Sequence, residues 1–243
     1  MRNLSITCLL SLYVTFTGCQ TTNTEEWFKV GQDIYGQAYG QPISQQEIAA
    51  GLKQALEVGT NTVVAQIGKR NGFYRDTTIH ISLPDSLAKV QRTLNKVGLS
   101  SYLDELELSL NRAAEQAVPK AKILFLQAIR DMSWDDVMQI YNGPDDAATR
   151  YFQNKMTPTL KREMYPVIQT TLASAGVIKA YDNVMKEYYA IPFVPNVKAD
   201  LGEYAMEKTL DGMFYYLAKE EAAIRHDPRK RTTELLKRVF AAN

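Results

Sequence analysis

The residue types that most often perform metal or nucleophilic chemistry are scarce in this chain. Its 243 residues include two histidines, His80 and His226, which are far apart in the sequence and belong to no His-Glu-x-x-His motif. Both cysteines, Cys8 and Cys19, lie close to the N-terminus. The chain also lacks a phosphate-binding loop and the glycine spacing of a dinucleotide site. We therefore expect no metal site, no cofactor and no cysteine or Ser-His-Asp enzyme.

Charge gives no reason to expect a polymeric acidic partner. The chain has 28 basic and 27 acidic residues, a formal net charge of +1. Nucleic-acid-binding domains carry a clear excess of positive charge, so nucleic acid is not an expected partner.

Four polar residues could form a catalytic face on one helix. Glu107, Asn111, Arg112 and Glu115 lie opposite a stripe of leucines at helical spacing. Two carboxylates on one face can act as acid and base in glycoside chemistry. A surface helix needs a polar stripe in any case, so we favour the interpretation that this face is solvated.

Aromatic and methionine side chains gather in the C-terminal half of the chain. Tyrosine carries a hydroxyl that needs a partner when buried, so this many tyrosines favour a groove or an interface, although core packing is the alternative. The candidate ligand or partner contacts are Tyr181, Met185, Tyr188, Tyr189, Phe193, Tyr204, Tyr215 and Tyr216.

The N-terminus is typical of a bacterial lipoprotein signal. Arg2 precedes an apolar run that is too short for a permanent membrane span, and the sequence FTGC ends at Cys19. This order predicts a signal peptide over residues 1–18 and acylation of Cys19, which would anchor the protein in a membrane. Gln20 is not aspartate, so we expect the outer membrane, with the protein facing the periplasm. A plain secretory signal is the alternative.

The remaining chain is expected to be a tether over residues 19–43 and one helical domain over residues 44–243. Helix starts are predicted at Ser44, Pro84, Ser133 and Asp200, where capping residues or a proline precede an apolar periodic stretch. One stretch, residues 79–83, alternates like a strand, but an isolated strand has nothing to pair with. The fold class is therefore predicted to be all-α, a single multi-helix, bundle-like domain.

Prolines are expected to divide this domain further. Pro119 should end one helix, and the pair Thr157-Pro158 should begin another, which Pro166 should kink. The pair Asp227-Pro228 should begin the last helix.

Four segments together resemble a family of bacterial envelope proteins catalogued as domain of unknown function 4197. They are GLKQAL at residues 51–56, ELSLNRAAE at 107–115, DDAATRYF at 145–152 and RTTELLKRVF at 231–240. The resemblance covers nearly all of the helical domain. It implies a helical exported domain, often behind a lipoprotein signal, and supplies no catalytic residue.

These observations favour a non-enzymatic binding module anchored through Cys19, with a protein or an apolar molecule as its partner. A carrier of a lipid or other apolar ligand is an alternative. A further alternative is an enzyme on cell-wall glycan that uses Glu107 and Glu115.

Overall fold

The computed structural model describes residues 43–95, 101–191, 193 and 200–241 of the chain. By their internal contacts the residues divide into two units, Met1–Pro42 and Ile43–Asn243, and every described residue belongs to the second. The predicted signal peptide, Cys19 and nearly all of the predicted tether lie outside the described residues.

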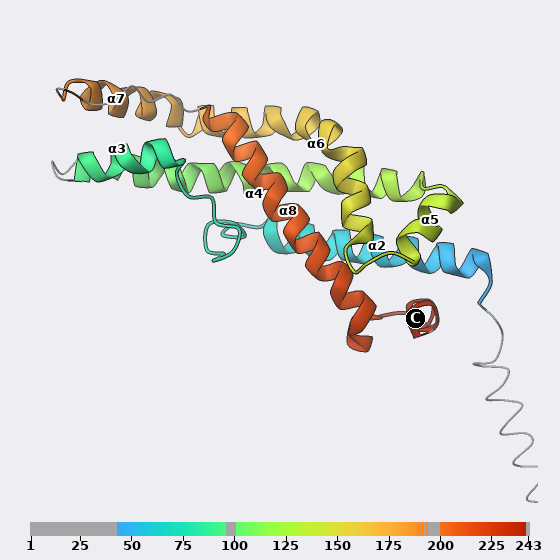
Figure 1. Cartoon of the computed structure of the whole chain (residues 1–243). Helices are drawn as coiled ribbons and strands as arrows, with labels where there is room; N and C mark the ends of the chain where they lie inside the picture. The colour runs from blue at the N-terminus through green and yellow to red at the C-terminus, as the bar shows by residue number, and fades with distance from the viewer. Residues whose placement is uncertain (1–42, 96–100, 192, 194–199, 242–243) are drawn as a thin grey trace, which may run out of the picture. The chain divides into compact units, whose positions relative to one another are not determined.

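The described part of the chain is helical and contains no strand, which confirms the all-α prediction (Figure 1). Its elements, in chain order, are α2 (Gln45–Ile67), α3 (Asp85–Asn95), α4 (Ser101–Arg130), α5 (Trp134–Tyr141), α6 (Ala147–Ser174), α7 (Val177–Tyr189), α8 (Leu201–His226), a 3-10 turn η1 (Pro228–Lys230) and α9 (Glu234–Ala241).

The long helix α4 is central to the packing. It contacts α2, α6, α7 and α8, while α2 also packs against α8 and α9. Figure 1 shows α8 crossing α4 at a steep angle. The side chains between these helices form one continuous apolar core.

The predicted helix starts follow from local capping. Ser44 and Ser133 each form a capping box, in which the serine hydroxyl accepts the N–H of the third helical residue and the carboxylate of that residue accepts the serine N–H. Asp200 accepts the N–H of Glu203 at the start of α8. Each bond satisfies N–H groups that a helix leaves without a partner.

The predicted breaks at prolines are wrong. Helix α4 continues through Pro119, and α6 continues through both Pro158 and Pro166. The hydroxyl of Thr157 donates to the carbonyl of Gln153 within α6, so Thr157 does not cap a new helix. Figure 1 shows α6 bending along its length, as expected when proline removes a backbone N–H. Packing on α4 keeps the helix continuous across the missing bonds.

The predicted start of the last helix is also wrong. Asp227 accepts the N–H of Arg229, but this begins only the turn η1, and α9 starts at Glu234. Gly51 of α2 lies against Val239 of this last helix. A Cβ at Gly51 would come 2.6 Å from a Val239 methyl, so these two helices approach this closely only at a glycine.

Candidate functional site

The predicted polar face of α4 binds the segment that connects α2 to α3, residues 68–84. Glu107, Asn111 and Glu115 follow each other at intervals of four residues and point to this connecting segment. Asn111 is 0 % exposed and Glu115 is 3 % exposed. The prediction of a solvated face is therefore wrong for these two residues, because the connecting segment covers them.

Glu115 holds the first part of the connecting segment. One carboxylate oxygen accepts the backbone N–H groups of Phe73 and Tyr74, both at 3.1 Å, and the other accepts Arg112 at 2.5 Å. Arg112 also donates to the side chain of Asn71, whose φ of 68° marks the sharp turn after α2. Both oxygens of Glu115 are thus occupied by protein donors.

Asn111 and Glu107 hold the second part. The Asn111 amide accepts the N–H of Ile81 at 2.9 Å and donates to the carbonyl of the same residue at 2.8 Å. Glu107 accepts the N–H of Leu83 at 3.2 Å and pairs with the ring of His80 at 2.9 Å. The two carboxylates proposed for glycoside chemistry therefore bind backbone groups and neighbouring side chains of this protein.

The predicted aromatic contacts fall into two groups on different helices. The first belongs to α7 and the residues after it, Tyr181, Met185, Tyr188, Tyr189 and Phe193. Met185 and Tyr188 are buried in the core, and α7 packs on α4 and α6. Tyr189 and Phe193 are exposed.

The second group lies on α8, where it meets the connecting segment. The Tyr204 hydroxyl donates to the carbonyl of Ser82 at 2.9 Å, and the Tyr216 hydroxyl donates to Asp76 at 2.5 Å. Tyr215 is 46 % exposed, and its ring meets that of Tyr216 edge to face. Two separate tyrosines of α8 thus bind the connecting segment while a third remains accessible.

Between α8 and the connecting segment runs a groove of about 430 Å³, which we call the α8 groove. Ligand sites typically have volumes of roughly 300–1,000 Å³. Its lining combines tyrosine rings, hydroxyls and an ion pair, and consists of Thr78, Ile79, His80, Ser82, Tyr204, Lys208, Asp211, Gly212 and Tyr215.

Gly212 is the point at which α8 and the connecting segment pack closely beside the groove. A Cβ at this position would come 3.0 Å from both Ile79 and Phe73, so the glycine lets the connecting segment approach α8.

Hydrogen bonds fix the wall of the groove. Burial acts to raise the pKa of Asp76, but the Tyr216 hydroxyl and the N–H groups of Thr78 and Ile79 stabilise its charged form and leave the pKa lowered. The same bond, with burial and the charge of Asp76, raises the pKa of Tyr216 to about 12. Tyr216 therefore remains a hydrogen-bond donor throughout the neutral range.

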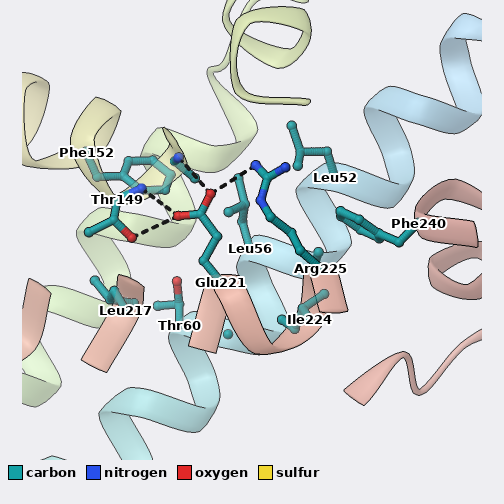
Figure 2. Close-up of a pocket in the computed structure, with 13 residues that line it drawn as sticks. Leu52, Leu56, Thr60, Thr149, Phe152, Leu217, Glu221, Ile224, Arg225 and Phe240 are labelled. Carbon is teal, nitrogen blue, oxygen red and sulfur yellow. Dashed lines mark hydrogen bonds and ion pairs between the residues drawn. The ribbon is translucent and has the colours of Figure 1, made fainter. Parts of the chain in front are cut away.

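A second pocket lies between α2, α6, α8 and α9 (Figure 2). Glu221 of α8 accepts the N–H groups of Ala148 and Thr149 at the start of α6, each at 2.9 Å. Arg225, one turn later, pairs with Glu221 at 3.1 Å and donates to the carbonyl of Ile140 at the end of α5. The negative side chain thus meets a helix N-terminus and the positive one a helix C-terminus, which the helix dipoles favour.

This pocket is too small for an apolar ligand. Its free volume is about 30 Å³, enough for roughly two water molecules. Its apolar lining includes Leu52, Leu56, Phe152 and Phe240. The Nε of Arg225, which also lines the pocket, is buried without a hydrogen-bond partner among the described residues. The pocket is a packed junction of helices, and it offers no cavity of the size that a lipid carrier needs.

Comparison with known protein families shows which family the chain belongs to. A family model described as "Protein of unknown function (DUF4197)" matches residues 42–241. The chain belongs to this family. No curated protein and no solved structure matches the chain.

The segments that resemble the DUF4197 family are brought together in the fold. Residues 51–56, 145–152 and 231–240 all contribute side chains to the pocket of Figure 2. The fourth segment, residues 107–115, holds the connecting segment on α4. The residues that carry the resemblance to DUF4197 therefore build the helix junction and the wall behind the α8 groove.

Two features of the site were missed by sequence reasoning. The first is the ion pair of Glu221 and Arg225, whose side chains are only 8 % and 9 % exposed. Their spacing of four residues is the one signal available, and many exposed pairs share it. Nothing local in the sequence indicates that the connecting segment covers α4.

Proposed function

We propose that this protein is a lipid-anchored, non-enzymatic binding module whose contact surface is the α8 groove. The observation that carries the proposal is the groove itself, which brings Tyr204 and Tyr215 together with polar side chains around a space of ligand size. A tyrosine that remains nearly half exposed beside such a space is available for a partner. Of the contact residues predicted from the sequence, the proposal keeps those on α8 that line the groove, Tyr204 and Tyr215.

Two further observations support binding over the alternatives. Glu115 is fully hydrogen-bonded within the protein, so it is unsuited to act as a catalytic acid or base. The pocket of Figure 2 is far smaller than a lipid requires.

The anchor is proposed from the sequence around Cys19. Acylation there would attach the protein to the outer membrane and leave its helical domain in the periplasm. None of the helices in the described residues is long and apolar enough to cross a membrane. Growth on labelled palmitate tests the anchor: wild type should incorporate the label and Cys19→Ala should not, whereas equal incorporation would contradict the proposal.

Photo-crosslinking tests the contact surface. A benzophenone amino acid at Thr78, an exposed residue on the rim of the α8 groove, should form an adduct in intact envelopes, detected by intact mass as protein or non-protein. The matched control places the same group at Ile123, which is 68 % exposed on α4. No adduct at Thr78, or equal adducts at both positions, would overturn the proposal.

A further inference from the structure

The tyrosines of the α8 groove are held in place before any ligand binds. Asp76 binds the hydroxyl of Tyr216, and the ring of Tyr216 meets that of Tyr215 at a centroid distance of 5.2 Å and an angle of 83°. The ring of Tyr204 is fixed by the bond of its hydroxyl to Ser82. Rigid aromatic side chains bind at a low cost in conformational entropy, which favours their use as contacts.

The charges that line the groove are balanced. Its cation, Lys208, lies 3.4 Å from its anion, Asp211, and His80 is paired with Glu107 behind the wall. Among the described residues that line the groove, each charged side chain thus has a partner of opposite sign, and a strongly acidic or basic molecule gains little from them.

The remaining chemistry of the groove is amphipathic. Ile79 and Gly212 form an apolar floor, Tyr204 and Tyr215 contribute ring surfaces, and Thr78 and Ser82 add hydroxyls at the rim. A sugar ring has the complementary character, because one face carries C–H groups and its edge carries hydroxyls. The electron-rich face of a tyrosine attracts the slightly positive C–H groups, while the rim can exchange hydrogen bonds with the hydroxyls.

We propose that the α8 groove binds a short, neutral glycan chain, with Tyr215 as its main stacking surface. This inference rests on the proposed binding function and names the class of ligand. Binding involves no catalytic step, because the glycan dissociates chemically unchanged. An extended peptide is the other molecule that a groove of this kind could accept, and the experiment separates the two.

Calorimetric titration of the full chain tests the proposal. The probes are tetramers of N-acetylglucosamine and of glucose joined by β-1,4 links, with N-acetylated and amidated tetra-alanine as the peptide. We expect at least one oligosaccharide to bind and the peptide not to bind. Tyr215→Ala should weaken binding about tenfold or more, because a central aromatic contact is removed. Tyr215→Phe, which keeps the ring, should weaken it less.

Tyr189→Ala is the matched control, because Tyr189 is similarly exposed, at 44 %, but lies on α7 outside the groove lining. It should leave oligosaccharide binding unchanged, and circular dichroism should show that all variants are folded. The inference is overturned if neither oligosaccharide binds at millimolar concentration, if the peptide binds instead, or if both alanine variants weaken binding equally. A groove adduct at Thr78 without oligosaccharide binding would remove the glycan and leave the binding function standing.

Discussion

The side-chain amide of Asn111 does for Ile81 what the backbone of a neighbouring strand would do. It pairs with both the N–H and the carbonyl of one residue, and it is fully buried while doing so. A buried backbone group that loses its partner costs about 1–3 kcal/mol, so a single amide can decide whether the connecting segment stays on α4. Its neighbours Glu107 and Glu115 bind other backbone N–H groups in the same way.

Replacing this amide should therefore be costly. We expect Asn111→Ala to lower the free energy of unfolding by about 2–4 kcal/mol, because both groups of Ile81 remain buried without a partner. Urea unfolding followed by circular dichroism measures the change. The control is Asn142→Ala, an exposed residue that bonds to Met138, which should change stability by less than about 0.5 kcal/mol. Equal effects of the two variants would contradict the role of Asn111.

The bond between Tyr216 and Asp76 predicts a particular pH dependence. The pKa of Tyr216 is raised to about 12 from 10.0, so its contribution to stability is fully present below pH 10 and disappears as the pH rises through about 12. Wild type should be more stable than Tyr216→Phe at pH 7. This difference in stability should shrink as the pH rises from 10 to about 12. Urea midpoints of both proteins along this range measure it.

A spectroscopic titration checks the same bond independently. The difference in tyrosinate absorbance between wild type and Tyr216→Phe should report one group that ionises near pH 12. Ionisation of that group near pH 10 would show that Asp76 does not hold the Tyr216 hydroxyl.

At the scale of whole elements, a feature can be predicted from the sequence when the contact that stabilises it lies nearby in the chain. The starts of α2, α5 and α8 were predictable, because each capping bond joins residues three positions apart. The continuation of α4 and α6 through prolines was not, because neighbouring helices supply the stabilisation. The buried face of α4 could not be predicted for the same reason, since residues 68–84 cover it from another part of the chain. Likewise, the aromatic group of α7 can be distinguished from that of α8 only when the packing of these two helices is known.

Pro119 gives a direct test of this packing argument. The residue is exposed within α4, and alanine there would supply the N–H that proline lacks. We expect Pro119→Ala to raise the free energy of unfolding by about 1–3 kcal/mol, as measured by urea unfolding. Lys120→Ala, its exposed neighbour, should change it by less than about 0.5 kcal/mol. A clear loss of stability in the proline variant would show instead that α4 needs Pro119 for its path.

The junction of α5, α6 and α8 depends on a buried pair of charges. Glu221→Gln should lower the free energy of unfolding by about 3–5 kcal/mol, because it leaves Arg225 buried without its counter-charge. Thermal and urea unfolding both measure this loss.

Asp146→Asn is the matched control for that junction. It breaks a pair with Arg150 at the same spacing of four residues, but that pair is exposed and should contribute less than about 1 kcal/mol. Similar losses of unfolding free energy in the two variants would mean that burial does not set the strength of the pair between Glu221 and Arg225.

At the scale of the whole molecule, residues 43–243 should be an independent folding unit. They have their own continuous core, and the match to the family begins at residue 42. We expect a chain of residues 43–243 to unfold cooperatively in urea, with a midpoint equal to that of the longer chain that starts at residue 20. A shifted midpoint would show that residues 20–42 contribute to the stability of the fold.

The contact between α2 and α9 has a consequence for how the protein is made. Thr233, which precedes α9, bonds to Gln54 of α2 across 179 positions, and Arg238 of α9 pairs with Glu47. During synthesis α2 emerges early, yet the surface around Gly51 has no cover until the last residues leave the ribosome. A premature stop codon shortly before residue 234 would remove less than a twentieth of the chain and still leave a product with an open core. Such a product is a natural substrate for proteases, so truncation at this end should be as damaging to protein abundance as a much larger deletion.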